Sequence, residues 1–267
     1  EGEFLCIGHW QNGSIAVKVL SFENERIDYG FVLERIRTAV ELRQTIGMFT
    51  DKDTTIFRLV NGEGDFMPSL IADYYDGLVV VQFHSIGMYL LKEEIVQALK
   101  EILQDNCKAI YCKSSSTLPK QEGIIAKDEF MFGTLEEDWY ALENGIRYKI
   151  DYALGQKTGF FIDQKDNRKL VCEMSKGKKV LNTFAYTGGF SLSAIKGGAK
   201  EVVSVDISSR AVAICESNAK ENFPQSSIHR GETADVLKYL DDIEQGRYDL
   251  IILDPPAFAK HQRHTQQ

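Results

Sequence analysis

The sequence predicts an α/β protein whose last third folds as a parallel, doubly wound sheet. From residue 178 onward, strand and helix patterns alternate in the order "KVLNTF", "GGFSLSAIKG", "EVVSVD", "SSRAVAICESNAKEN", "DVLKYLDDI" and "YDLIILD". Such alternation is typical of parallel strands joined by covering helices. The run "LIIL" (250–253) is apolar on both faces, as expected of a central parallel strand. We therefore expect further strands beside it, and we expect the sequence to continue beyond residue 267.

The composition is that of a globular protein with one to three domains. Of 267 residues, 43% are hydrophobic and 26% are charged. No apolar run approaches the roughly 18 residues of a membrane span, so we expect no membrane partner. The net charge of −8 argues against non-specific nucleic-acid binding by the whole surface, although it permits a local basic patch. The five cysteines form no C-x-x-C pair, which argues against a zinc ribbon or disulfide framework and favours a reducing cytoplasm.

Three segments are expected along the chain. Residues 1–45 combine short strands such as "SIAVKVLSF" with a helix over 28–44, residues 46–133 form a small α+β domain, and residues 134–267 form the α/β domain. The apolar stripe expected for the first helix consists of Phe31, Ile36, Val40 and Leu42, with Arg35, Arg37 and Arg43 off it.

A hairpin and a helix are expected where the last segment begins. Residues 139–155 alternate like a β-hairpin, with Asn144-Gly145 as its turn. Asp163 is a candidate N-cap for the helix that follows. The apolar face of that helix would carry Leu170, Val171 and Met174.

The glycine turn "LNTFAYTGGF" (181–190) and the acid after it carry the first functional signal. Its two glycines, Gly188 and Gly189, are adjacent, so the turn lacks the G-x-G-x-x-G spacing that cradles a pyrophosphate. Asp206 closes the next strand 18 positions after Gly188, where a carboxylate can accept both ribose hydroxyls of a nucleoside. S-adenosylmethionine (SAM) has a ribose and an adenine but no phosphate, and the glycines would let it lie close to the backbone. The alternative is a tight strand-to-helix turn in which Asp206 only caps the next helix.

A second signal is "DPPAF" (254–258), which ends the last strand. Two prolines stop the strand and stiffen the loop. Asp254 would accept a hydrogen bond from a target base, and Phe258 would offer a stacking face for that base. The alternative is a rigid strand terminator with a packed phenylalanine.

The segment "GQKTGFFIDQKDNR" (155–168) is polar and aromatic at once. Gln164 and Arg168 are four positions apart, on one helical face, and could hold the amino-acid end of SAM. Phe160 and Phe161 could wall the pocket, or be ordinary core residues below an exposed helix start. Asp235 could accept the adenine amino group, serve as an N-cap, or do both. The histidines show no metal-ligand spacing, and we expect no metal.

Taken together, "GQKTGFFIDQKDNR", "LNTFAYTGGFSLSA", "VDIS" and "LDPPAFAK" resemble the class I SAM-dependent methyltransferases that make 5-methylcytosine in bacterial large-subunit ribosomal RNA. The resemblance is strongest over 155–258. It implies a Rossmann-like class I methyltransferase domain, preceded by a small α+β domain and the end of a PUA-like domain over residues 1–45. It also implies RNA as the partner and ribosomal RNA as the substrate, and is compatible with a homodimer.

The resemblance also implies residue roles. The catalytic loop would be Asp254, Pro255, Pro256 and Phe258, with Asp254 on the target cytosine. The cofactor site would consist of Gln164, Arg168, Asn182, Phe184, Ala185, Tyr186, Thr187, Gly188, Gly189, Asp206, Ser208 and Asp235.

One departure from the family pattern leaves alternatives open. The nucleophilic cysteine of that family belongs to a later motif, and "DPPAF" carries no cysteine directly after its prolines. Cys172 and Cys215 fall within expected helices and are interpreted as core thiols, whereas Cys6, Cys107 and Cys112 precede the catalytic domain. A methyltransferase acting on an exocyclic amine of guanine or adenine would need no cysteine. A non-catalytic RNA-binding protein is a third possibility, and a nicotinamide dehydrogenase is disfavoured because the phosphate-binding glycines are absent.

Overall fold

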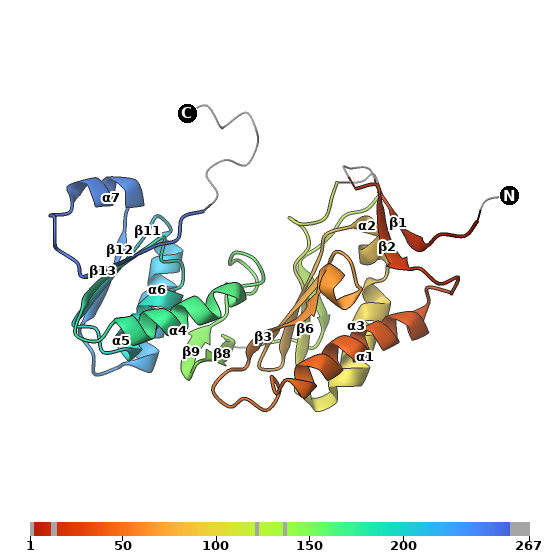
Figure 1. The fold of residues 1–267 in the computed structure, drawn as a ribbon, viewed down its shortest axis with the longest axis horizontal. Coiled ribbons are helices and arrows are strands. Elements are labelled where there is room, and N and C mark those ends of the chain that lie inside the picture. The colour runs from red at the N-terminus through yellow and green to blue at the C-terminus, as the bar shows by residue number, and fades with distance from the viewer. Residues whose placement is uncertain (1–2, 12–14, 121–122, 136–137, 257–267) are drawn as a thin grey trace. The chain divides into compact units, whose positions relative to one another are not determined.

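The computed structural model describes residues 3–11, 15–120, 123–135 and 138–256 (Figure 1). Contacts divide the chain into two compact units. The first contains Glu1–Gly145 and Ile150–Ile162, and the second contains Ile146–Lys149 and Asp163–Gln267. The assignment of residues 1–45 to a PUA-like domain, with boundaries near 45 and 133, stays a prediction.

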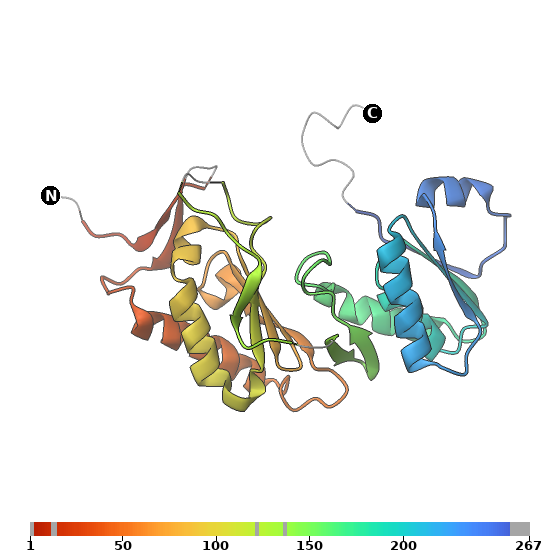
Figure 2. The ribbon, with the colours of Figure 1, turned by 180° about the vertical axis from the view of Figure 1, so that it is seen from behind.

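The first unit is built on a five-stranded mixed sheet. Its strand order is β3-β4-β5-β6-β7, in which only β5 and β6 pair in parallel. These strands are β3 (Ile56–Asn61), β4 (Leu70–Tyr75), β5 (Leu78–Phe83), β6 (Ala109–Cys112) and β7 (Glu129–Phe132). The remaining elements are the hairpin β1 (Ile7–Trp10) and β2 (Val17–Ser21), and the helices α1 (Tyr29–Thr45), α2 (Ile86–Leu90) and α3 (Lys92–Leu103). Helices α1 and α3 pack side by side and share one apolar core with the sheet (Figures 1 and 2).

Helix α1 forms where the sequence predicts it, but its buried face differs in two positions. Phe31, Ile36 and Val40 are buried as expected. Leu42 is 50% exposed, so its assignment to the stripe was wrong. Arg43, expected off the stripe, is only 7% exposed. Its guanidinium forms a bidentate ion pair with Asp65, with Nη1–Oδ1 and Nη2–Oδ2 distances of 2.6 and 2.8 Å.

The segment from 150 to 162 is held by polar side chains of the first unit's sheet. The Thr158 hydroxyl donates to Asp73 Oδ2 at 2.6 Å, and Asp73 is itself buried and paired with Arg58. Gln82 Nε2 donates to the Lys157 carbonyl at 3.1 Å. These bonds compensate for burying the Asp73 charge and fix the backbone that leads into the second unit.

The predicted β-hairpin is confirmed. Strand β8 (Tyr140–Glu143) pairs with β9 (Ile146–Lys149) through the turn Asn144-Gly145. Both turn residues have positive φ, +51° and +69°, as a type I′ turn requires.

The second unit confirms the predicted parallel sheet. Its order is β12-β11-β10-β13, and all three pairings are parallel. The strands are β10 (Lys179–Thr183), β11 (Glu201–Asp206), β12 (His229–Thr233) and β13 (Leu250–Leu253). The helices are α4 (Lys165–Met174), α5 (Gly189–Lys196), α6 (Ser209–Asn222) and α7 (Val236–Asp242).

Alternate strand residues feed two apolar cores on opposite faces of this sheet. Val180 and Val202 pack with residues of α4, α5 and α6. Leu181 and Val203, the next residue on each strand, pack with Val236 of α7. Helices therefore cover both faces, as in a doubly wound fold.

Details at α4 and β13 differ from the sequence predictions. Asp163 does not cap α4: it lies in a 3-10 turn, and the N-cap is Gln164, without a side-chain bond. Of the three residues expected on the apolar face of α4, only Val171 is buried, whereas Leu170 and Met174 are exposed. Among the described residues β13 is an edge strand. Its residues are alternately half-buried and exposed, whereas the sequence predicted a strand buried on both faces.

No helix in the described part of the chain is long and apolar enough to cross a bilayer.

The Arg43–Asp65 pair yields a stability prediction for the first unit. Asp65→Ala leaves the buried guanidinium without its counter-charge, so we expect a loss of about 3 kcal/mol in the free energy of unfolding. Denaturant unfolding measures it. Arg37→Ala is the control because Arg37 and Glu34 form an exposed pair at 3.7 Å, worth at most about 1 kcal/mol. Equal losses in the two variants would contradict this account of the buried pair.

Candidate cofactor site

The turn between β10 and α5 has an unusual backbone. Phe184, Tyr186 and Gly188 all have positive φ, of +51°, +48° and +87°. For the two aromatic residues this left-handed conformation costs about 1–2 kcal/mol each. Within the turn, the Gly188 N–H donates to the Ala185 carbonyl at 2.9 Å. The Ala185 N–H donates to the Val205 carbonyl of β11 at 3.0 Å and so connects the turn to that strand.

Asp206 lies directly beside this turn. Its Oδ2 accepts the Tyr186 N–H at 2.9 Å, and its Oδ1 accepts the Ser208 N–H at 2.8 Å. The side chain is half-buried at the carboxyl end of β11. Each carboxylate oxygen has a second lone pair, so Asp206 can hold the turn and still accept two ligand hydroxyls.

Packing within the second unit favours glycine at both positions, most strongly at Gly188. A Cβ on Gly188 would lie 2.3 Å from Cys215 Sγ, and one on Gly189 would lie 3.0 Å from Arg168 Cδ. The expectation that these glycines let a ligand lie close to the backbone stays a prediction, and the structure adds a packing role. They let α6 and α4 pack against the turn.

Helix α5 begins at this turn without a side-chain cap. Its N-cap is Gly188, which has no side chain to accept a hydrogen bond from the first N–H groups of the helix. The N-terminal N–H groups and the positive end of the helix dipole suit an anionic group such as the carboxylate of methionine.

A buried polar chain lies beneath the turn. Asn182 Nδ2 donates to Ser191 Oγ at 2.8 Å, Ser191 and Ser204 hydroxyls are 2.6 Å apart, and Ser204 Oγ lies 2.8 Å from His229 Nε2. Burial lowers the pKa of His229, so the ring is neutral at neutral pH. Asn182, predicted in the cofactor site, is 1% exposed, and its amide supports the turn from inside.

Sequence reasoning missed the residues that hold the other side of the turn. Asn218 of α6 donates to the Thr187 carbonyl at 3.1 Å and accepts the Lys149 N–H at 2.9 Å. The buried Tyr148 donates its hydroxyl to the Gly189 carbonyl at 3.2 Å. The one signal for Asn218 was a polar side chain on the helix face that also carries Cys215 and Ala219.

The structure brings the predicted catalytic loop and part of the predicted cofactor site together. Gln164 Nε2 lies 3.4 Å from Asp254 Oδ2. Asn167 Nδ2 donates to Gln164 Oε1 at 2.6 Å and so orients the amide. Arg168 is buried, with its side chain against Gly189. An exposed carboxylate next to an oriented amide can bind the polar edge of a base.

The other predicted residues occupy simpler positions. Ser208 caps α6 and Asp235 caps α7; Asp235 Oδ1 accepts the Leu237 and Lys238 N–H groups at 3.0 and 3.3 Å. The N-cap interpretation of Asp235 is confirmed, and its contact with adenine stays a prediction. The structure leaves Pro255 and Pro256 exposed, assigns Phe160 and Phe161 to the first unit, and does not describe Phe258.

Within the described ranges, no three His, Cys, Asp or Glu side chains are grouped as metal ligands would be.

The parallel sheet, the glycine turn without phosphate-binding spacing and the acid at the end of β11 define a Rossmann-like class I methyltransferase domain. Residues 57–267 match the S-adenosylmethionine-dependent methyltransferase family, and the chain belongs to that family.

Similar proteins cover nearly all of this chain. It is 38% identical to the YwbD protein of Bacillus subtilis over 99% of the chain and 67% of the relative. It is 36% identical to ribosomal RNA large subunit methyltransferase I of Aeromonas hydrophila over 97% of the chain and 66% of the relative. The solved structure of SMU.776, a methyltransferase complexed with SAH, superposes with a TM-score of 0.84 at 26% identity, covering 97% of this chain and 66% of that one. The chain thus spans about two thirds of the length of these relatives.

The predicted cofactor, SAM, is confirmed by the family. The site fits it, because a half-buried carboxylate and an uncapped helix start flank one turn with no phosphate-binding glycine pattern.

The contact between Gly188 and Cys215 gives a double-mutant test. Gly188→Ala adds a methyl group against Cys215 Sγ and strains a left-handed position, which should cost about 2–4 kcal/mol of stability. Adding Cys215→Ala should recover at least about 1 kcal/mol, because it removes the overlapping sulfur. Thermal unfolding of the four proteins measures the coupling. Strictly additive stability losses would show that the contact with Cys215 is not the reason why glycine occupies position 188.

Proposed function

We propose that the complete protein uses SAM to methylate large-subunit ribosomal RNA, and that the atom it methylates is carbon 5 of cytosine. The substrate class comes from the A. hydrophila relative, which is named a ribosomal RNA large subunit methyltransferase. The observation that carries the proposal is that Asp206 lies beside the glycine turn while Asp254 lies beside Gln164 of the same unit.

In this proposal, different residues of the chain bind the ribose, the methionine carboxylate and the adenine of SAM. Asp206 accepts the ribose hydroxyls with the lone pairs that Tyr186 and Ser208 leave free. The start of α5 holds the methionine carboxylate, and the second oxygen of Asp235 accepts the adenine amino group. When bound, SAM supplies an electrophilic methyl group.

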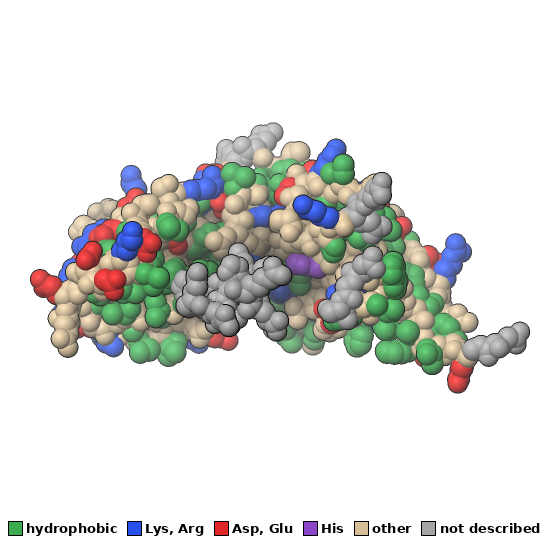
Figure 3. Space-filling model, turned by 90° about the horizontal axis from the view of Figure 1, so that it is seen from above, with side chains coloured by type: hydrophobic (Ala, Val, Ile, Leu, Met, Phe, Trp, Pro, Cys, Tyr) green, Lys and Arg blue, Asp and Glu red, His purple; other side chains and the backbone are tan. Residues whose placement is uncertain are grey.

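The target base is held at the exposed end of β13. Asp254 accepts a hydrogen bond from the exocyclic amino group of cytosine, and Gln164 keeps its carboxylate in place. On the surface shown in Figure 3, Lys and Arg side chains are scattered among Asp and Glu and form no broad basic patch. Because the net charge of −8 gives no general attraction to phosphate, we expect local contacts of this kind to position the RNA.

Carbon 5 of cytosine is a poor nucleophile and needs a thiolate. A thiolate that adds to carbon 6 directs electron density to carbon 5, which takes the methyl group; loss of the carbon 5 proton then expels the thiolate. Burial raises the pKa of Cys107 to about 11 and that of Cys215 to about 12, and also raises the pKa of Cys112. These three thiols stay protonated at neutral pH. Cys172, interpreted from the sequence as a core thiol, is only half-buried on α4, and Cys6 lies in the first unit. We propose that a cysteine of the complete protein other than these five supplies the thiolate.

Asp206→Asn tests the cofactor site. The amide loses the charge and one acceptor, so SAM binding should weaken by about 3 kcal/mol, or roughly 100-fold in Kd. Isothermal titration calorimetry measures it. The matched control is Asp249→Asn, because Asp249 accepts the Lys179 N–H at the opposite end of β10. Wild-type SAM affinity in a folded Asp206→Asn protein would remove Asp206 from the site.

The product identifies the reaction. Mass spectrometry of nucleosides from unmodified large-subunit rRNA, treated with the complete protein and SAM, should show 5-methylcytosine. RNA treated with residues 1–267 alone should not, and Cys172→Ser in the complete protein should keep full activity. 5-Methylcytosine made by residues 1–267 would contradict the thiol argument. A methylated exocyclic amine would instead favour a reaction at Asp254 without a thiol.

A further inference from the structure

Phe66 is a large aromatic residue in a left-handed backbone conformation, which bulky side chains disfavour. It follows the 3-10 turn Gly62–Asp65, its φ is +56°, and it is 64% exposed. Bulky residues rarely adopt positive φ, and glycine or asparagine would do so at lower cost. Such strain is kept where the surrounding structure over-determines it, often at functional positions.

The surrounding structure does fix Phe66. The preceding residue, Asp65, is held by Arg43, and its Oδ2 also accepts the Asn61 N–H at 2.6 Å. The following residue, Met67, is fully buried and donates its N–H to the Gly62 carbonyl at 3.0 Å. The Phe66 ring is thus presented on a rigid turn.

A guanidinium lies between this ring and a second one. The Arg35 Cζ atom is 4.9 Å from the Phe31 ring centroid and 5.4 Å from the Phe66 ring centroid. Among the described residues Arg35 forms no ion pair, so its donors are not neutralised by a carboxylate. Arg35 and the exposed ring over which it lies are here called the Phe66–Arg35 stack.

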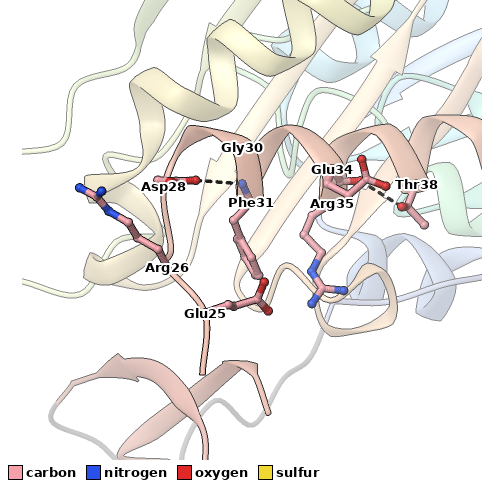
Figure 4. A pocket seen from close by; sticks show the side chains of 8 residues that line it. All are labelled: Glu25, Arg26, Asp28, Gly30, Phe31, Glu34, Arg35 and Thr38. Atoms are coloured by element: carbon pink, nitrogen blue, oxygen red, sulfur yellow. Dashed lines mark hydrogen bonds between the residues drawn. The ribbon is translucent and has the colours of Figure 1, made fainter. Parts of the chain in front are cut away.

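A pocket of about 480 Å³ adjoins the Phe66–Arg35 stack. Figure 4 shows Phe31 and Arg35 extending from α1 toward the same side as Glu25, whereas Arg26 points away. The residues that line the pocket are Glu25, Arg26, Asp28, Gly30, Phe31, Glu34, Arg35 and Thr38. Three carboxylates against two guanidinium groups make this a poor phosphate site. They suit a ligand that offers N–H donors.

A nucleobase combines these properties. It has a flat π face for Phe66, acceptors for the Arg35 guanidinium, and, in adenine, cytosine and guanine, an amino group for a carboxylate. We propose that the Phe66–Arg35 stack binds an unpaired base of the RNA substrate. This inference rests on the proposed function, and it gives the first unit a direct role in RNA recognition.

The test compares aromatic and aliphatic residues at position 66 in the complete protein. Phe66→Leu keeps an apolar side chain but removes the π face, so its affinity for a 12-nucleotide oligoadenylate and for an unmodified large-subunit rRNA transcript should fall about 5- to 100-fold. Phe66→Trp should retain affinity, and the added tryptophan fluorescence should be quenched by the oligonucleotide. Phe22→Leu is the control, since Phe22 is also exposed but is not part of the Phe66–Arg35 stack.

A stability readout separates binding from a structural role. Phe66→Gly should raise the Tm of the protein, because glycine relieves the positive φ, and should still weaken RNA binding. Wild-type RNA affinity in Phe66→Leu would overturn the proposal and would leave a protein segment as the ligand of the Phe66–Arg35 stack. In that case, rRNA methylation by the wild-type protein would still support the proposed function. Failure of the wild-type protein to bind either RNA would overturn both.

Discussion

The hydrogen bond from the Tyr186 N–H to the Asp206 carboxylate is the contact on which the candidate site depends. Tyr186 has a left-handed backbone that costs about 1–2 kcal/mol, and a bond to a charged acceptor contributes about 1.5–3 kcal/mol. The second is large enough to offset the first. One carboxylate therefore both shapes the turn and presents free lone pairs beside it, so the turn and the proposed ribose acceptor are a single structural feature.

The rest of the second unit supports this turn from three sides. Cys215 and Arg168 occupy the space that side chains at Gly188 and Gly189 would fill. Asn218 holds the Thr187 carbonyl from α6. The glycine pair is thus explained by packing, and Cys215 is a structural thiol, in keeping with the high pKa that its burial causes. In the proposed site, groups on the turn bind the ligand and the buried groups hold the turn in place.

The sequence predicted those features that depend on local chemistry. Asn144-Gly145 specifies a hairpin turn by itself, and alternating strand and helix patterns specify a parallel sheet. The sequence prediction failed where a contact with a residue far along the chain determines whether a side chain is buried. Arg43 is buried because Asp65, 22 positions away, neutralises it, and helical periodicity contains no information about that partner. Similarly, the sequence placed Asn182 near the cofactor turn, but only the fold shows that its amide bonds to Ser191.

The central claim is that Asp206 binds the cofactor ribose beside the turn. A crystal structure of the protein with SAH tests it most directly. The account predicts both ribose hydroxyls within hydrogen-bonding distance of the Asp206 carboxylate, with the Tyr186 N–H bond retained. SAH bound with its ribose away from Asp206, or a turn that gives up the Tyr186 bond to admit the ligand, would contradict it.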